Sequence, residues 1–489
     1  MKAQKFIAML LVLSFLAALF GCADKASGGG DKSASTTENI PEETTGYTLD
    51  LPETNMDGKI FTFLTTNWPG EDIWTMNEIT IEEQDGSAVN DAMYLRNVNV
   101  QSRFNCTIGE RNIPSFIDAV NELYKSIQAG DNAYDIFIPR MQALTTLIVK
   151  DMIIDLKKLG YIDFTKPWWD ARAVEDLALA GKNFGANSYM TTMDKGAIST
   201  FVFNKELMKD YNITPPYDYI LEGSWTINKM AEQIKAVSSD LDGNGQMNEN
   251  DLYGLLYQRD TLHDLLIASG ESVAKKDAQD LPYVSLNTDS AISKIQHMFT
   301  ILYDTSTCFN VMTLPGDFNV GMNNMFQNNQ GLYMWIRMVN IVPLRTMEAD
   351  FGIAVVPKFD DSQKEYYSTV NPYTGIFICV PITNPDTDYT GMFLEAMAYE
   401  GYVNVRPAYY DTLLTGIIAR DNESSQMLDI LFANRRYDLG LILEMGDLRS
   451  FIYMVMTYDT NIVSYVEKRL RLANKDIEKL TQALLENSD

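Results

Sequence analysis

The first half of the chain alternates short apolar runs with longer segments whose apolar residues recur at helical spacing. The runs at residues 58–68, 106–110 and 134–140 are typical of buried strands. Residues 85–104 and 113–130, which lie between them, have the pattern of amphipathic helices. Strands that alternate with helices in this way predict a mostly parallel sheet that is covered by helices on both faces.

The second half continues the pattern and adds a helical end. Residues 223–240 are typical of a helix, and residues 331–336 of an apolar strand that follows a polar helix end. Residues 350–359 and 366–381 resemble two further strands, and most of the chain after residue 389 is helical in pattern. Roughly 440 residues are too many for one ordinary core, so the sequence predicts two lobes.

Four side chains are the candidates for ligand contact. Trp68 and Arg140 follow predicted strands, and ligands of open α/β sheets bind beyond the carboxyl ends of strands. Trp335 is placed by the same rule, and its flat ring suits the apolar face of a sugar. Tyr373 lies in the connection between two predicted strands. Packing in the core is the favoured interpretation for three other tryptophans, Trp168, Trp169 and Trp225.

The N-terminus has the features of a secretory signal peptide. Lys2 and Lys5 precede an uncharged apolar run over residues 6–20, which is too short to span a membrane. Cys22 then resembles the lipidated cysteine of bacterial lipoproteins, so residues 1–21 are the predicted signal peptide. Residues 22–46 are rich in Gly, Ser, Thr and Glu and are predicted to be a flexible tether. The chain is therefore expected on the outer face of the cell membrane, held by lipid alone.

Charge and composition exclude several classes of function. The net charge of -27 disfavours nucleic acid as a partner, since phosphate backbones are also negative. Only three cysteines follow Cys22, which rules out a disulfide framework. With two histidines and no catalytic motif, the sequence favours binding over catalysis. A hydrolase that uses a pair of carboxylates remains the alternative.

Residues 240–251, "DLDGNGQMNEND", have the spacing of a calcium-binding loop. Oxygen ligands fall at the required positions, Gly245 takes the sharp turn, and the last position holds an aspartate where a sensor loop has glutamate. A single loop of this kind suits a structural calcium ion and not a sensor that moves two helices. A turn without an ion is the alternative interpretation. The predicted ligands are Asp240, Asp242, Asn244, Gln246, Asn248 and Asp251.

Several stretches together resemble the bacterial extracellular solute-binding proteins of carbohydrate ABC importers, which are similar to maltose-binding protein. These stretches are residues 57–67, 90–104, 223–254, 344–370 and 375–402, and they follow a lipoprotein-like N-terminus. The resemblance covers essentially the whole mature chain. It rests on the order and pattern of the elements, because none of these stretches is a catalytic motif.

The resemblance implies a two-lobed α/β fold of the periplasmic-binding-protein type II, with mixed, mostly parallel sheets and a hinge between the lobes. By similarity, the first lobe takes residues 55–185 and 350–385, and the second takes residues 186–349 and 386–489. The ligand is expected in the cleft between them. The stretch "YMWIR" matches the strand end that carries a sugar-stacking aromatic in such proteins, which supports Trp335. Some members also have calcium loops.

The sequence therefore predicts a monomeric, lipid-anchored binding protein that captures a sugar or oligosaccharide and presents it to an ABC transporter permease. Two alternatives remain open: a surface carbohydrate hydrolase and a calcium-dependent surface interaction protein. Turnover of sugar would indicate the first. Loss of a partner on removal of calcium would indicate the second.

Overall fold

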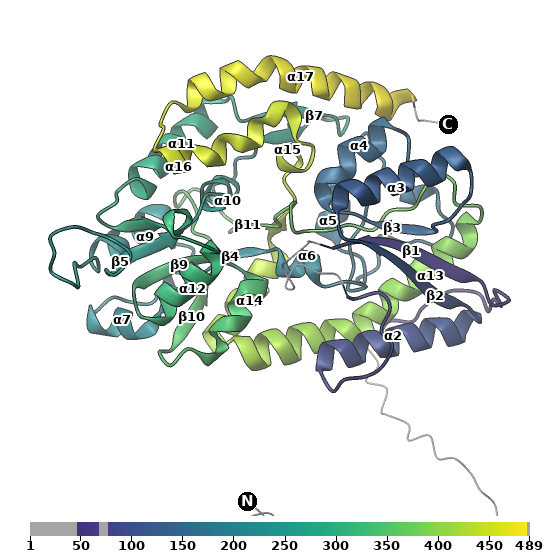
Figure 1. The fold of residues 1–489 in the computed structure, drawn as a ribbon, viewed down its shortest axis with the longest axis horizontal. Coiled ribbons are helices and arrows are strands. Elements are labelled where there is room, and N and C mark those ends of the chain that lie inside the picture. The colour runs from purple at the N-terminus through teal and green to yellow at the C-terminus, as the bar shows by residue number, and fades with distance from the viewer. Residues whose placement is uncertain (1–45, 68–76, 487–489) are drawn as a thin grey trace, which may run out of the picture. The chain divides into compact units, whose positions relative to one another are not determined.

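The computed structural model describes residues 46–67 and 77–486. Thr48–Asp489 form one compact unit, in which two main sheets of three and five strands are flanked by helices (Figure 1). This confirms the predicted mixed α/β fold. Cys22, Trp68 and the predicted signal peptide lie outside the described residues.

The first sheet has the order β2-β1-β3, with all pairs parallel. Helices α3 and α4 cover one of its faces, and α2 and α13 cover the other (Figure 1). The elements of this half are β1 (Ile60–Thr66), α2 (Ala88–Phe104), β2 (Thr107–Ile113), α3 (Phe116–Ala129), β3 (Ile136–Ile138), η2 (Met141–Ala143), α4 (Leu144–Val149), η3 (Leu156–Lys158), α5 (Ala171–Asp176) and α6 (Met193–Gly196).

The second sheet has the order β10-β4-β9-β5-β8, in which β5 runs parallel to β8 and β9 while β4 runs antiparallel to β9 and β10. The elements of this part of the chain are β4 (Ser199–Asn204), α7 (Lys205–Asp210), α8 (Tyr217–Leu221), α9 (Ile227–Lys235), β5 (Tyr253–Tyr257), α10 (Asp260–Ala268), β6 (Ala274–Lys276), β7 (Pro282–Val284), α11 (Asp289–Leu302), β8 (Cys308–Asn310), η4 (Val311–Thr313), α12 (Phe318–Gln327), β9 (Gly331–Arg337), η5 (Met338–Thr346) and β10 (Phe351–Ala354); β6 and β7 form a separate two-stranded sheet.

The last part of the chain is mostly helical, as its pattern predicts. It contains two π-helical stretches, η6 and η7, that continue α13. Its elements are β11 (Ser368–Thr369), α13 (Thr387–Glu400), η6 (Gly401–Val405), η7 (Pro407–Ile418), α14 (Asn422–Ala433), β12 (Arg435–Arg436), α15 (Leu439–Ile442), η8 (Met445–Tyr453), α16 (Met454–Thr457) and α17 (Ile462–Glu486).

Local sequence explains where many of these elements begin and end. In α3, the hydroxyl of Ser115 accepts a hydrogen bond from the amide of Asp118 at 3.3 Å, which caps the first turn. Gly130 ends the helix with a φ of 65°, a left-handed conformation that glycine adopts without strain. In β1, alternation of side chains sends Phe61 and Phe63 to one core and Leu64 to another.

The predicted boundaries of the lobes need two corrections. Residues 351–354 were expected in the first lobe, but β10 pairs with β4 in the second sheet. Residues 387–400 were expected in the second lobe, but α13 packs on the first sheet, where the rings of Phe393 and Phe61 stack at 4.0 Å. The return to the first sheet comes later, at residues 376–381, through backbone bridges such as Phe137 with Cys379.

Trp168 and Trp169 belong to the core, as the sequence favours. Both indole nitrogens donate hydrogen bonds of 2.8 Å to the carboxylate of Glu395 on α13, one to each oxygen. Burial raises the pKa of this carboxyl, while the two indole donors oppose the rise. The three groups satisfy one another inside the first lobe, so none of them is a candidate for ligand contact.

Three cysteines among the described residues have free, buried thiols: Cys106, Cys308 and Cys379. Among the helices that the structure describes, none combines the length and the apolar character that a membrane span needs.

The close approach of α13 to the first lobe gives a test of this packing. A Cβ atom at Gly391 would lie 1.8 Å from the carbonyl oxygen of Gly160, so Gly391→Ala should push the two backbones apart. We expect a loss of about 1–3 kcal/mol in the free energy of unfolding, measured in urea. Gly109→Ala is the control, because its Cβ would come closest to the exposed Ile60 side chain, at 3.2 Å, and would lie 3.8 Å or more from its other neighbours. Equal stability of the two variants would contradict the packing.

Candidate functional site

Polar side chains gather where strands of the second sheet end. The parallel strands β5 and β9 are neighbours, so their carboxyl ends lie at the same edge of the sheet. After β5 the chain continues through Gln258 and Arg259 to Asp260 at the start of α10. Strand β9 ends at Arg337. This edge therefore carries charged and amide groups, which is where a fold of this class binds ligands.

Asp260 joins three segments of the chain. Its Oδ2 atom accepts hydrogen bonds from Nη2 of Arg337 and, at 3.2 Å, from Nδ2 of Asn371. Nε of Arg259 lies 3.5 Å from the other carboxylate oxygen. Asp260, Arg337 and Asn371 are each less than a tenth exposed. A carboxylate buried in this way is stable because it is paired and hydrogen-bonded.

Asn371 begins a short loop that connects the two lobes. Its amide donates to the carbonyl of Ala197 at 3.0 Å, and its side-chain oxygen accepts from the amide of Tyr373 at 3.0 Å. Nη1 of Arg140 donates to the carbonyl of Thr374 in the same loop. Arg140 follows β3 of the first sheet, so the loop brings the carboxyl edges of both sheets to one place.

Two tyrosines with arginine neighbours border this place. The guanidinium of Arg449, on η8, lies 4.5 Å from the ring centre of Tyr373, and that of Arg259 lies 5.0 Å from the ring centre of Tyr453. Glu444 forms an ion pair with Arg449 at 3.2 Å. Tyr453 is 44% exposed, so its ring is available for contact. We call the whole set the central polar cluster: Arg140, Gln258, Arg259, Asp260, Arg337, Asn371, Tyr373, Glu444, Arg449 and Tyr453.

Burial shifts the pKa values of two groups in the central polar cluster. It raises the pKa of the Glu444 carboxyl, an effect that the positive charge of Arg449 opposes. It also raises the pKa of the Tyr373 hydroxyl, so this group is a neutral hydrogen-bonding group at physiological pH. Gln258 is only 1% exposed, and neither polar atom of its side chain has a hydrogen-bond partner among the described residues. A buried amide of this kind is suited to a polar ligand or bridging water.

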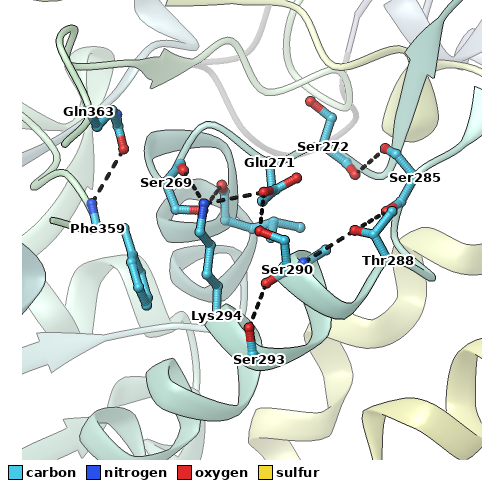
Figure 2. A network of polar contacts seen from close by, with 12 residues as sticks. Ser269, Glu271, Ser272, Ser285, Thr288, Ser290, Ser293, Lys294, Phe359 and Gln363 are labelled. Carbon is cyan, nitrogen blue, oxygen red and sulfur yellow. Dashed lines mark hydrogen bonds and ion pairs between the residues drawn. The ribbon is translucent and has the colours of Figure 1, made fainter.

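The far end of α10 is fixed by a second network, which Figure 2 shows. Glu271 accepts hydrogen bonds from Ser290 at 2.7 Å and from Lys294 at 3.2 Å, both on α11. Lys294 also donates to the carbonyl of Ser269 at 2.8 Å, which satisfies a free carbonyl at the helix end. Because α10 is held at this end, Asp260 at its other end has a defined position.

The predicted ligand residues have different surroundings. The cluster contains Arg140 and Tyr373, which are linked through the loop at residues 371–374. Trp335 is fully buried, and its indole nitrogen donates to Oδ2 of Asp264 at 2.8 Å, so the ring packs behind Arg337. Arg140 is also fully buried. In this conformation neither of these two side chains presents a surface to a ligand.

Sequence reasoning did not find Asp260, Asn371 or Arg449. Asp260 follows a buried strand, so the rule that singled out Arg140 applies to it equally. Asn371 and Asp260 are 111 positions apart, and no local signal connects them. Arg449 lies in a helical segment whose pattern resembles that of any surface helix.

The loop at residues 240–251 brings its carboxylates together. Oxygens of Asp240, Asp242 and Asp251 lie within 4.8 Å of one another. The two oxygens of Asp240 accept hydrogen bonds of 2.7 Å from the amides of Gly243 and Gly245, and these bonds lower its pKa. Asp251 is fully buried, while the other two carboxylates are exposed. The oxygen ligands and their spacing fit a hard cation such as calcium.

No protein-family model and no curated protein sequence matches the chain. Solved structures match its fold. The ABC substrate-binding protein Lmo0181 of Listeria monocytogenes, in complex with cycloalternan, has a TM-score of 0.51 and 13% identity, and the match covers 88% of this chain and 99% of that one. A cyclo/maltodextrin-binding protein complexed with maltotetraose has a TM-score of 0.54 and 15% identity, with the same two coverages.

The cyclic alpha-maltosyl-1,6-maltose binding protein of Arthrobacter globiformis has a TM-score of 0.55 and 14% identity, and the match covers 87% of this chain and 99% of that one. At this level of identity the likeness establishes the fold. The chain has the two-lobed architecture of these substrate-binding proteins.

Asp260→Asn tests the centre of the cluster. Asparagine keeps the shape of the side chain but leaves the charge of buried Arg337 without its carboxylate, and we expect a loss of about 3–5 kcal/mol in the free energy of unfolding. Urea denaturation of residues 47–489 measures it. Asp361→Asn, at an exposed position, is the control and should change stability by less than about 0.5 kcal/mol. A loss no larger than that of the control would show that Asp260 does not hold the cluster together.

Proposed function

We propose that this protein is a lipid-anchored, extracellular substrate-binding protein that captures a sugar or oligosaccharide between its two lobes and delivers it to the permease of an ABC transporter. The observation that carries the proposal is the central polar cluster, which lies where the carboxyl edges of both sheets and a crossing loop meet. The fold that contains this cluster is shared with sugar-binding proteins.

The chemistry of the cluster suits a neutral ligand with many hydroxyl groups. Three of its four arginines, Arg259, Arg337 and Arg449, are paired with the carboxylates of Asp260 and Glu444. Such pairs offer both donors and acceptors to the hydroxyl groups of a ligand. The rings at the border add flat apolar surface of the kind that covers a sugar ring.

All four predicted ligand residues are included in this proposal. Tyr373 contacts the ligand directly from the crossing loop. Trp68 follows β1 in the sequence and stays a predicted contact that lies outside the described residues. Arg140 and Trp335 are covered in this conformation, so both remain predicted contacts that this conformation does not expose. The protein binds and releases the ligand, which stays chemically unchanged.

The proposed anchor explains the N-terminal sequence. Cys22 carries the lipid, and the polar tether that follows it lets the lobes move near the membrane surface. Anchoring keeps the loaded protein at a high effective concentration beside its permease.

We propose that calcium has a structural role in this protein. The ion is held by the loop at residues 240–251, with Asp240, Asp242, Asn244, Gln246, Asn248 and Asp251 as ligands. The loop is joined to the second sheet through the hydrogen bond from Gln330 to the carbonyl of Glu249, at 2.8 Å. An ion there would therefore stabilise the start of β5 and would act as a structural support with no signalling role.

Thermal melting of residues 47–489 against a panel of defined glycans tests the main proposal. A ligand at a hundred times its dissociation constant stabilises the folded state by about 2.7 kcal/mol, which for a chain of this size raises the melting temperature by about 3 °C. Tyr453→Ala should reduce the shift for the glycan that binds. Tyr211→Ala is the matched control, because Tyr211, which caps the C-terminal end of α7, is similarly exposed, at 40%.

The proposal requires that the recovered glycan is chemically unchanged. Hydrolysis products would favour the hydrolase alternative instead. If no glycan shifts the melting temperature of the wild-type protein, the assignment to carbohydrate transport is wrong.

Removal of calcium should lower the melting temperature of the wild-type protein. For a weak extracellular site at millimolar calcium, the ion contributes about 0.6–2 kcal/mol, so chelation should lower the melting temperature by about 1–2 °C. Asp242→Asn should abolish the difference between calcium and chelator. Asp360→Asn changes an exposed aspartate in an ordinary turn and should leave the difference intact. Identical melting of the wild-type protein in both conditions would exclude the ion.

A further inference from the structure

The C-terminal helix α17 contacts both lobes. Its N-terminal part lies beside α11 of the second lobe, and its C-terminal part lies over α4 of the first (Figure 1). Because α17 is a single helix of 25 residues, it forms a rigid connection between parts of the two lobes. This connection is separate from the loop at residues 371–374.

The attachment of α17 to the second lobe is close and specific. The amide of Gly446, on η8, donates to the carboxylate of Asp476 at 2.8 Å. A Cβ atom at Gly446 would lie 2.5 Å from the backbone nitrogen of Ala473, so only glycine fits against the helix there. The hydroxyl of Tyr465 donates to the carbonyl of Asp447 at 2.9 Å. Helix α17 is thus fixed to the segment that carries Arg449 of the central polar cluster.

The attachment to the first lobe uses the last turns of the helix. Leu480 and Leu484 are buried, in the same core as Leu147 and Ile148 of α4. Nζ of Lys182 donates to the carbonyl of Leu484 at 2.7 Å, where a cation also suits the negative end of the helix. This end rests on a few apolar contacts and polar bonds, so it can detach without unfolding the rest of α17.

A second contact between the lobes lies on the hairpin of β6 and β7. Nζ of Lys276 donates to the carbonyls of Glu175, at 2.6 Å, and Ala178, at 3.1 Å, in the first lobe. The amide of Ala180 donates to the carbonyl of Asp280 at 3.1 Å. Helix α17 also contacts β7, so the hairpin and the helix support the same connection.

We propose that the last turns of α17 are a strap that holds α4 of the first lobe against η8 of the second and limits how far the lobes separate. Two-lobed proteins of this fold class move by rotation about the segments that cross between the lobes. With the strap attached, the rotation that separates α4 from η8 is blocked. With the strap detached, that rotation is opposed by fewer contacts, among them the hydrogen bond from Thr145 of α4 to the carbonyl of Leu443 at 3.0 Å. The open population then rises from the roughly 0.1–10% that is typical of a minor state. The strap does not depend on which solute is bound.

The distance between the lobes in the ligand-free protein tests the strap directly. Spin labels at Asp118→Cys on α3 and Lys209→Cys on α7 report this distance by double electron–electron resonance, and both positions are exposed. The native thiols of Cys106, Cys308 and Cys379 are buried and will not be labelled. Leu484→Ala, made in the labelled chain, should give a several-fold larger fraction of long distances than the wild-type sequence.

Leu485→Ala is the matched control, since Leu485 is the next residue on the same helix and is 60% exposed. It should leave the distance distribution unchanged. Hydrogen exchange should show that Leu484→Ala opens only the last turns of α17. If Leu484→Ala loses its cooperative melting, Lys182→Ala carries the same test, because it removes the bond to the carbonyl of Leu484.

A distance distribution that Leu484→Ala leaves unchanged, while hydrogen exchange shows that the last turns are open, would overturn the strap. Equal changes in Leu484→Ala and Leu485→Ala would also overturn it, since they would indicate a general loss of stability. None of these results depends on binding of a glycan, so the strap and the proposed function fail or hold separately.

Discussion

The carboxylate of Asp260 is the constraint on which the centre of the molecule depends. One of its oxygens accepts hydrogen bonds from Arg337, on a strand of the second sheet, and from Asn371, on the segment that returns to the first sheet. A buried ion pair costs desolvation, but removal of either partner costs more, so the three groups hold one another in place. The position of Asn371 then sets the loop that carries Tyr373 and accepts the hydrogen bond from Arg140.

Local patterns predicted those parts of the fold that local forces decide. The helix predicted within residues 113–130 and the apolar run of β9 follow from a few neighbouring residues, and the structure has both close to where the sequence places them. The strand-end rule pointed to Arg140, and it applies equally to Asp260. It does not indicate that Trp335 is buried: β9 is a central strand with buried residues throughout, so a ring near its end packs inside. Asn371 has no local signal, because its role depends on a distant partner.

The assignment of segments to lobes needed information that the sequence pattern lacks. The apolar run of β10 fits the edge of either sheet, and only its pairing with β4 decides between them. Helix α13 has a buried face by its pattern, but the pattern does not say which sheet that face meets. Glu395, which is hydrogen-bonded to two neighbouring indoles, shows that the face meets the first lobe. The sequence alone does not predict this contact, because the chain contains many carboxylates and many aromatic residues.

Both sheets share one hydrophobic core, and this affects when the protein can fold during its synthesis. Leu480 and Leu484, near the end of the chain, lie in the same core as Leu147 and Ile148, which are synthesised much earlier. A ribosome makes the chain from its N-terminus, so the nascent protein cannot complete this core until its final helix has emerged. Until then the earlier residues lack part of their packing. The completion of this core is therefore among the last steps of folding during synthesis.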